Sequence, residues 1–267
     1  MVSLLASIRM WTGHVDAATR LAEQARIKFV KLGDAFGLSQ ALTVLGRSQV
    51  ALGDPNAART SESLIAQSEI QGQSPFPYMA AAGIAMHAGE GKAAVLLADE
   101  AIERFVAIHA NAGEAYIVKA MGLVQSGLFD DARVALGHVA EELLVHPFYL
   151  AALAIVAALE NDRDEAIASA EAVAEAPGHT YLDGVIASVG AGASAAASGD
   201  AEAAQRWLDI AVAQALATED VVATALSLAA FEHVLGWPHL AGGGRLDGLA
   251  VGWRCMVEAL PRLVNVG

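Results

Sequence analysis

The sequence predicts an all-α protein made of stacked antiparallel helix pairs, and three observations lead to this prediction. Apolar residues make up 55% of the 267 positions, whereas charged residues make up 17% and aromatic residues 6%. Alanine supplies much of the apolar share and is the strongest helix former. A turn motif also recurs along the chain, and the segments around it carry apolar residues at helical spacing.

The recurring motif is a turn residue followed five positions later by alanine. Glycine and asparagine tolerate the left-handed conformation that ends a helix, and the polar residue after the turn can cap the next helix. Because one helix pair cannot bury its apolar face alone, neighbouring pairs must stack. The turn residues are Gly13, Gly53, Gly89, Gly127, Asn161 and Gly199, spaced by 40, 36, 38, 34 and 38 positions.

The remaining elements follow in chain order. Only the residues before Gly13 are available to the first helix, so we expect a shortened first unit. Apolar residues keep helical spacing through 40–52 and 93–107, on either side of the predicted turns. Loops between units are predicted at the breakers in 72–75 and 177–178.

The C-terminal end departs from the pattern. Residues 220–235 read as the first helix of a seventh unit, which the sequence Gly236-Trp237-Pro238 ends. A turn at Gly242–Gly244 then leads to a last helix over 246–260. We therefore predict an array of helix pairs over 1–236 and an atypical capping segment over 237–267, because a terminal repeat meets solvent on one side. In that segment, the residues expected to cover the last core layer are Trp237, Trp253 and Cys255.

Parts of the sequence resemble two known families. Leu45-Gly46 followed by Gly53 and Ala58, together with the turn at 127–132, resembles the tetratricopeptide repeat (TPR) family. This resemblance implies a right-handed superhelical array of antiparallel helix pairs, a TPR-like α-solenoid, whose first helices line a concave face. Residues 32–54 are also similar to the helical sensor arrays of large bacterial signal-transduction ATPases, which include maltose-regulator-like transcription activators. In that group the array receives an inducer or a partner protein, which implies a role in signal transduction and transcription regulation.

The candidate binding surface follows from the concave face that the resemblance implies. Methionine and aromatic side chains on a curved surface suit an apolar peptide or a small ligand, although such side chains also pack between helices. A clamp for an acidic C-terminus could use only Arg47, Arg9 and Lys119, so we expect apolar ligands to bind better than acidic peptides. The predicted lining consists of Trp11, Arg47, Met79, Met86, His87, Ile117, Met121, Val124, Phe148 and Ile155.

Composition argues against several partners and compartments. The chain has 30 acidic and 16 basic residues, a net charge of −14, and its basic residues form no cluster. We therefore expect no direct binding to nucleic acid or to an anionic membrane surface. The strongest apolar run, 143–159, is interrupted by His146 and Pro147 and is too short to span a bilayer. Without a signal-peptide pattern at its start, the chain is expected to be cytoplasmic, and its single cysteine, Cys255, excludes an intrachain disulfide.

No catalytic constellation is evident. The glycines in 190–195 superficially match a dinucleotide-binding fingerprint, but the strand that this motif requires is not predicted. His138 and Glu142 could share a helix face, without a third metal ligand. We therefore expect a non-catalytic module, without metal or cofactor, that binds a protein, an apolar peptide or a small-molecule inducer as the sensor or scaffold segment of a bacterial regulator. The alternatives are a self-associating structural module, which would be a homo-oligomer, and an unrecognised enzyme.

Overall fold

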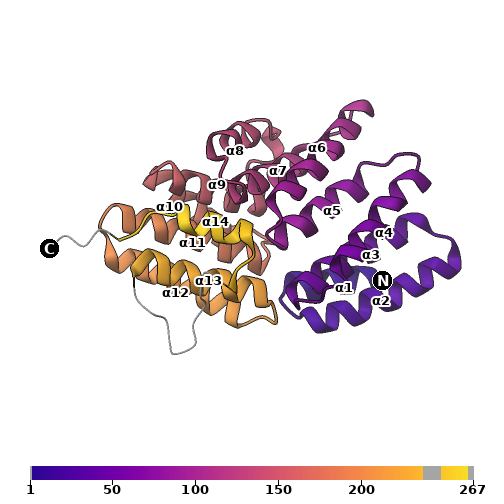
Figure 1. The fold of residues 1–267 in the computed structure, drawn as a ribbon, viewed down its shortest axis with the longest axis horizontal. Coiled ribbons are helices and arrows are strands. Elements are labelled where there is room, and N and C mark those ends of the chain that lie inside the picture. Colours follow the sequence, from indigo (N-terminus) through magenta and orange to yellow (C-terminus); the bar gives the residue numbers. More distant parts are fainter. Residues whose placement is uncertain (1, 237–247, 264–267) are drawn as a thin grey trace.

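The computed structural model of the protein describes residues 2–236 and 248–263. These residues form helices and contain no strand, so the all-α prediction is confirmed. Consecutive helices pack against each other as antiparallel pairs in a solenoid-like array (Figure 1). The helices of the described residues are α1 (Val2–Trp11), α2 (Val15–Leu32), α3 (Ala35–Ala51), α4 (Ala57–Ile70), α5 (Phe76–His87), α6 (Gly91–Ala107), α7 (Gly113–Gln125), α8 (Phe129–Leu136), the short 3₁₀ helix η1 (Glu141–Leu143), α9 (Pro147–Leu159), α10 (Arg163–Glu175), α11 (Tyr181–Ala197), α12 (Ala201–Leu216), α13 (Val221–Leu235) and α14 (Val251–Ala259).

The six turn residues lie between the two helices of each pair. All six have positive φ, between 61° and 79°, as the motif predicts. The residue after the turn caps the next helix in two pairs, where the side chains of Asp162 and Asp200 accept hydrogen bonds from backbone N–H groups. His14 and Glu90 occupy the same position and make no side-chain cap. The turn conformation is therefore the regular part of the motif, and the cap is not.

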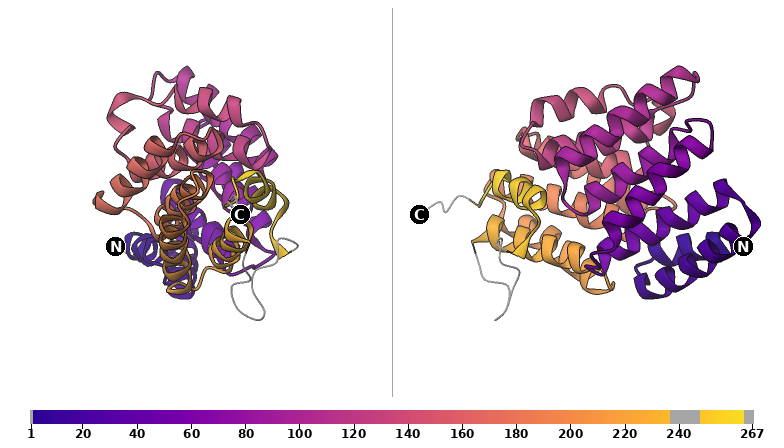
Figure 2. Two further views of the ribbon diagram at one scale, coloured as in Figure 1. Left: turned by 90° about the vertical axis from the view of Figure 1, so that its left-hand side faces the viewer. Right: turned by 45° about the vertical axis from the view of Figure 1, so that its right-hand side comes forward.

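The odd-numbered helices form the inner layer of the array. Contacts run from α1 to α3 and onward through α5, α7, α9 and α11 to α13, whereas each even-numbered helix from α2 to α12 packs chiefly on the odd-numbered helices beside it. The views in Figure 2 show this array bending continuously, so that its two ends approach each other. Side chains on the inner helices of distant units can therefore face a common interior.

The array bends far enough for its seventh unit to meet its first. The backbone N–H of Glu219, in the loop between α12 and α13, donates to the carbonyl of Gly13 at 3.2 Å. The Glu219 carboxylate accepts from the backbone N–H of Asp16 at 2.7 Å. Helix α13 also contacts α3, and Figure 1 shows the orange α12 and α13 beside the indigo N-terminal helices. These contacts close the curve of the inner layer.

The last helix, α14, docks on the turn edge of the third and fourth units. Trp253 is fully buried, and its indole N–H donates to the His87 carbonyl at 2.9 Å. The N–H of Gly252 donates to the carbonyl of Gly89 at 3.0 Å. A side chain at Gly89 would meet the Trp253 ring at 2.7 Å, so this turn needs glycine for close approach as well as for its positive φ.

The predictions for the C-terminal segment agree with the structure in part. Helix α14 covers Val251–Ala259, a shorter span than the predicted 246–260. Trp253 is buried as expected and Cys255 is partly buried, whereas the predictions for Trp237, Pro238 and the Gly242–Gly244 turn lie outside the described residues.

The structure also bears on the possible dinucleotide-binding fingerprint and on the possible metal-ligand pair. The glycine-rich stretch 190–195 lies within α11 and not after a strand, so it lacks the context that a dinucleotide-binding fingerprint requires. The prediction that His138 and Glu142 share a helix face is wrong, because α8 ends at Leu136 and Glu142 belongs to a separate 3₁₀ turn. Across 2–236 and 248–263, no helix combines the length and apolar character that crossing a membrane requires.

Candidate functional site

A cavity of about 440 Å³ lies inside the curve of the array. Its lining comes from α1, α3, α5, α7 and α11, from Gln71 after α4, from the residues that begin α9, and from the loop before α11. The cavity therefore joins units that are far apart in the sequence. A volume of this size falls in the range that holds small organic molecules.

The walls of this central cavity are largely aromatic and sulfur-containing. Trp11, Phe36 and Phe76 keep 47%, 62% and 50% of their surface exposed, so the cavity is open to solvent where these three side chains lie. Methionine side chains adapt to ligands of different shape, and aromatic rings offer large flat apolar contacts. The apolar wall consists of Trp11, Phe36, Phe76, Met79, Met86 and Phe148.

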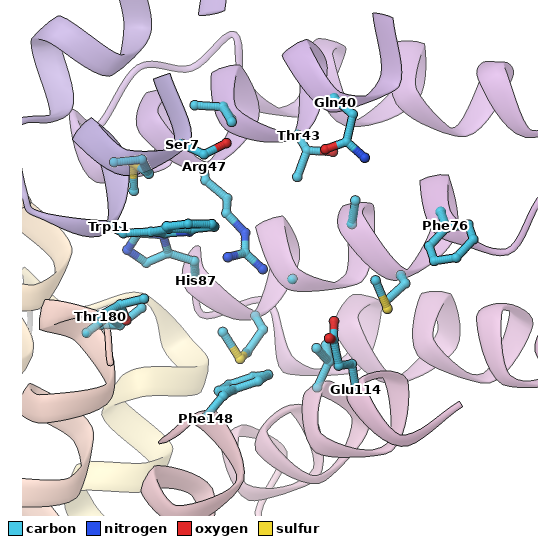
Figure 3. A pocket seen from close by; sticks show the side chains of 18 of the residues that line it. Ser7, Trp11, Gln40, Thr43, Arg47, Phe76, His87, Glu114, Phe148 and Thr180 are labelled. Atoms are coloured by element: carbon cyan, nitrogen blue, oxygen red, sulfur yellow. The ribbon is translucent and has the colours of Figure 1, made fainter. Parts of the chain in front are cut away.

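One cationic side chain enters this apolar space without a partner. Arg47 extends from α3 into the cavity, between Trp11 on one side and Glu114 and Phe148 on the other (Figure 3). Its guanidinium makes no hydrogen bond or ion pair with any residue that the structure describes, and its Nε is fully buried. Since buried polar groups are normally hydrogen-bonded, the Nε of Arg47 is an unsatisfied donor in this fold.

Helix α5 leaves room for this guanidinium because it carries glycine at the point of contact. A β-carbon added at Gly83 would lie 2.7 Å from Nη2 of Arg47. Any larger residue would therefore push the guanidinium away from α5. Gly83 thus helps to set the position of Arg47 in the cavity.

Two carboxylates influence Arg47 from the cavity wall. Burial lowers the pKa of Arg47, while the charges of Asp183 and Glu114 raise it in opposition; an arginine remains protonated in either case. Asp183 is itself buried, and burial raises the pKa of its carboxyl against the opposing effect of Thr180. Thr180 donates to Asp183 Oδ2 through both its backbone N–H and its hydroxyl, at 2.8 Å each, in a capping box that begins α11.

A second polar cluster lies where α5, α11 and α13 meet. His87 Nε2 and Asp220 Oδ2 are 2.8 Å apart, and the Tyr181 hydroxyl donates to the same oxygen at 2.7 Å. The other Asp220 oxygen accepts from the backbone N–H groups of Val222 and Ala223 and so caps α13. His87 and Tyr181 line the central cavity, so Asp220 ties the seventh unit to the cavity wall.

The surroundings of Asp220 determine its charge. Burial would raise the pKa of this carboxyl, but the charge and hydrogen bond of His87, the hydrogen bond from Tyr181 and that from the Ala223 backbone together hold the pKa below its ordinary value. Burial and the neighbouring Asp220 carboxylate raise the pKa of Tyr181, so its hydroxyl remains a donor. Both oxygens of Asp220 are thus hydrogen-bonded within the protein, and the cluster connects α13 to the cavity wall.

Six of the ten residues proposed for the concave face line this cavity, namely Trp11, Arg47, Met79, Met86, His87 and Phe148. The other four are fully buried in the largest core cluster instead, so their side chains cannot reach a ligand in this structure; they are Ile117, Met121, Val124 and Ile155. Helix α14 packs against α7, and Trp253 and Met256 join the same cluster. Of the other basic residues considered for a clamp, Arg9 is exposed outside the cavity, and Lys119 pairs with Asp99 at 2.7 Å.

Glu114, Tyr181 and Asp183 also line the cavity and are not among the residues predicted from the sequence. A signal for Asp183 was available, because Thr180 followed three positions later by an acidic residue is a capping-box pattern at a helix start. Glu114 and Tyr181 carry no such local signal, since their role depends on which units face each other across the cavity. The structure describes no cluster of three or more histidine, cysteine or acidic side chains that could hold a metal ion.

Comparison with known proteins gives no family assignment, since no family model and no curated protein matches the chain. The fold and the cavity therefore define the class of protein by themselves. That class is an all-α array of helix pairs with an internal, mainly apolar cavity that contains an unpaired arginine.

Proposed function

We propose that this chain is a non-catalytic binding module that holds a small organic ligand in the central cavity. The observation that supports this proposal most strongly is the unpaired guanidinium of Arg47 inside a cavity of about 440 Å³. An unsatisfied buried donor costs about 1–3 kcal/mol. A ligand with acceptor atoms would remove that cost, while its apolar part would cover the aromatic and methionine wall.

The proposal extends to a sensor role in a regulatory protein, in line with the resemblance to bacterial sensor arrays. A ligand in the cavity would touch α3 and α5 near the N-terminus and α11 near the other end of the array. Binding would therefore favour the curved form in which these units face one another. A ligand shifts such an equilibrium by the difference in its affinity for the two forms.

Binding of a neutral apolar dye tests the proposal. N-phenyl-1-naphthylamine brightens in apolar surroundings, and we expect one dye molecule to bind per chain. The variant Thr43→Trp places a bulky side chain in the cavity wall and should weaken dye binding at least about tenfold, which corresponds to about 1.4 kcal/mol.

A closely matched control exists on an outer helix. Thr19 on α2 is also partly buried, and its hydroxyl donates to the carbonyl four residues before it, as that of Thr43 does. Thr19 does not line the cavity, so Thr19→Trp should leave dye binding unchanged. No dye binding to the folded protein, or equal loss in both variants, would show that the cavity is not a binding site.

A further inference from the structure

Two opposite charges line the central cavity without pairing with each other. Arg47 lies on α3, and Glu114 lies in the first turn of α7. Neither side chain makes a hydrogen bond or ion pair with any residue in the described part of the chain, yet the charge of Glu114 acts on Arg47. Both side chains line the cavity, and Figure 3 shows them entering it from different helices.

The remaining carboxylate of the cavity, Asp183, is already hydrogen-bonded through one of its oxygens. Asp183 is only 7% exposed, and its Oδ2 accepts two hydrogen bonds from Thr180. Glu114 is exposed to the cavity and retains all its acceptor capacity. Among the arginine and carboxylate side chains of the lining, the guanidinium of Arg47 and the carboxylate of Glu114 are therefore the two without a partner among the described residues.

The balance of charge restricts the ligand. A simple anion would bind Arg47 but would be repelled by the carboxylates of Glu114 and Asp183, and a simple cation would bind Glu114 but would be repelled by Arg47. A molecule with both charges satisfies both side chains. Charge-assisted hydrogen bonds are stronger than neutral ones, and a guanidinium pairs especially well with a carboxylate.

The uncharged lining indicates what such a molecule carries besides its charges. Met79, Met86, Phe76 and Phe148 lie in the wall around the two charged groups. They suit an apolar side chain of moderate size, which they would remove from water.

From these contacts we propose that the ligand is an amino-acid zwitterion with an apolar side chain, its carboxylate on Arg47 and its ammonium group on Glu114. This inference rests on the proposed function, because it concerns the same cavity. The zwitterion could come from a free amino acid or from a short peptide with free ends. The two differ in the separation of their charges, which is larger in the peptide.

A matched set of ligands tests the charge pairing. L-Phenylalanine has both charges, N-acetyl-L-phenylalanine lacks the positive charge, and L-phenylalaninamide lacks the negative charge. Calorimetric titration of the full chain should show L-phenylalanine binding at least about tenfold more tightly than either derivative. The dipeptide leucyl-phenylalanine forms the second arm, and tighter binding of the dipeptide than of the amino acid would support the same pairing and identify the source as a peptide.

Variants that remove one charge test which side chain binds which charged group of the ligand. Glu114→Gln should abolish the preference for the zwitterionic form over its N-acetyl derivative, and Arg47→Gln should abolish the preference over its amide. Glu103→Gln and Arg59→Gln remove exposed charges outside the cavity and should preserve both preferences. A variant that merely unfolds would be recognised by loss of the helical circular dichroism signal, and the ligand set on the native chain still decides the question.

The failures of the two proposals are distinguishable. If the dye binds in the cavity and N-acetyl-L-phenylalanine binds as tightly as the zwitterions, or no zwitterion binds, the ligand assignment is wrong while the binding function stands. If neither the dye nor any of these compounds binds, the proposed function is wrong, and the ligand assignment fails with it.

Discussion

Replacing Trp253 tests whether α14 is an integral part of the array. Its side chain is fully buried, and its indole N–H donates to the His87 carbonyl at 2.9 Å. Truncating a buried tryptophan to alanine costs about 3–5 kcal/mol, because apolar contacts are lost and a cavity remains. Trp253→Phe keeps most of the packing and loses the hydrogen bond, so its expected cost is about 1–2 kcal/mol.

Urea denaturation followed by circular dichroism measures these costs. With a slope of about 3 kcal/mol per molar urea, Trp253→Ala should lower the midpoint by about 1–1.7 M. Trp11 provides a comparison, because it is 47% exposed and its truncation should cost only about 1–2 kcal/mol. An unfolding free energy of Trp253→Ala within about 0.5 kcal/mol of the native value would show that α14 is not an integral part of the array.

Two further predictions concern the cavity and the Asp220 cluster that connects α13 to its wall. Gly83→Ala should weaken binding of L-phenylalanine at least about tenfold, because the added β-carbon displaces the guanidinium of Arg47. The free energy of unfolding should stay equal or rise, because alanine favours a helix over glycine by about 1 kcal/mol. Calorimetric titration and urea denaturation check these two results, and an unchanged affinity would contradict the first. Asp220 has a pKa below its ordinary value, so its stabilising effect is complete above about pH 4 and is lost as the pH falls through the lowered pKa. Asp220→Asn should therefore differ most from the native chain near neutral pH and approach it in acid, and a difference in unfolding free energy that stays constant with pH would exclude this role.

Much of the architecture is predictable from the sequence because its signals are local. Each turn is fixed by one residue that tolerates positive φ, as the values at Gly13, Gly53 and Asn161 show. The helices between turns follow from apolar spacing. These features do not depend on distant parts of the chain, so reasoning along the sequence identifies them.

The cavity is less predictable because it depends on the curvature of the whole array. The position of Arg47 on an inner helix was predictable, but its lack of a partner was not. Met121 and Ile117 were assigned to the concave face because they lie on an inner helix, yet α14 packs against that helix and both side chains join its buried cluster. Spacing from the turns identifies the inner helices, and only the tertiary contacts determine which side of each helix faces the cavity.

A crystal structure of the chain grown with L-phenylalanine tests the central claim most directly. We expect the amino acid in the central cavity, with its carboxylate at hydrogen-bond distance from Arg47, about 2.7–3.2 Å, and its ammonium group facing Glu114. A structure in which the cavity stays empty at saturating ligand, or in which the ligand lies elsewhere on the array, would contradict the account.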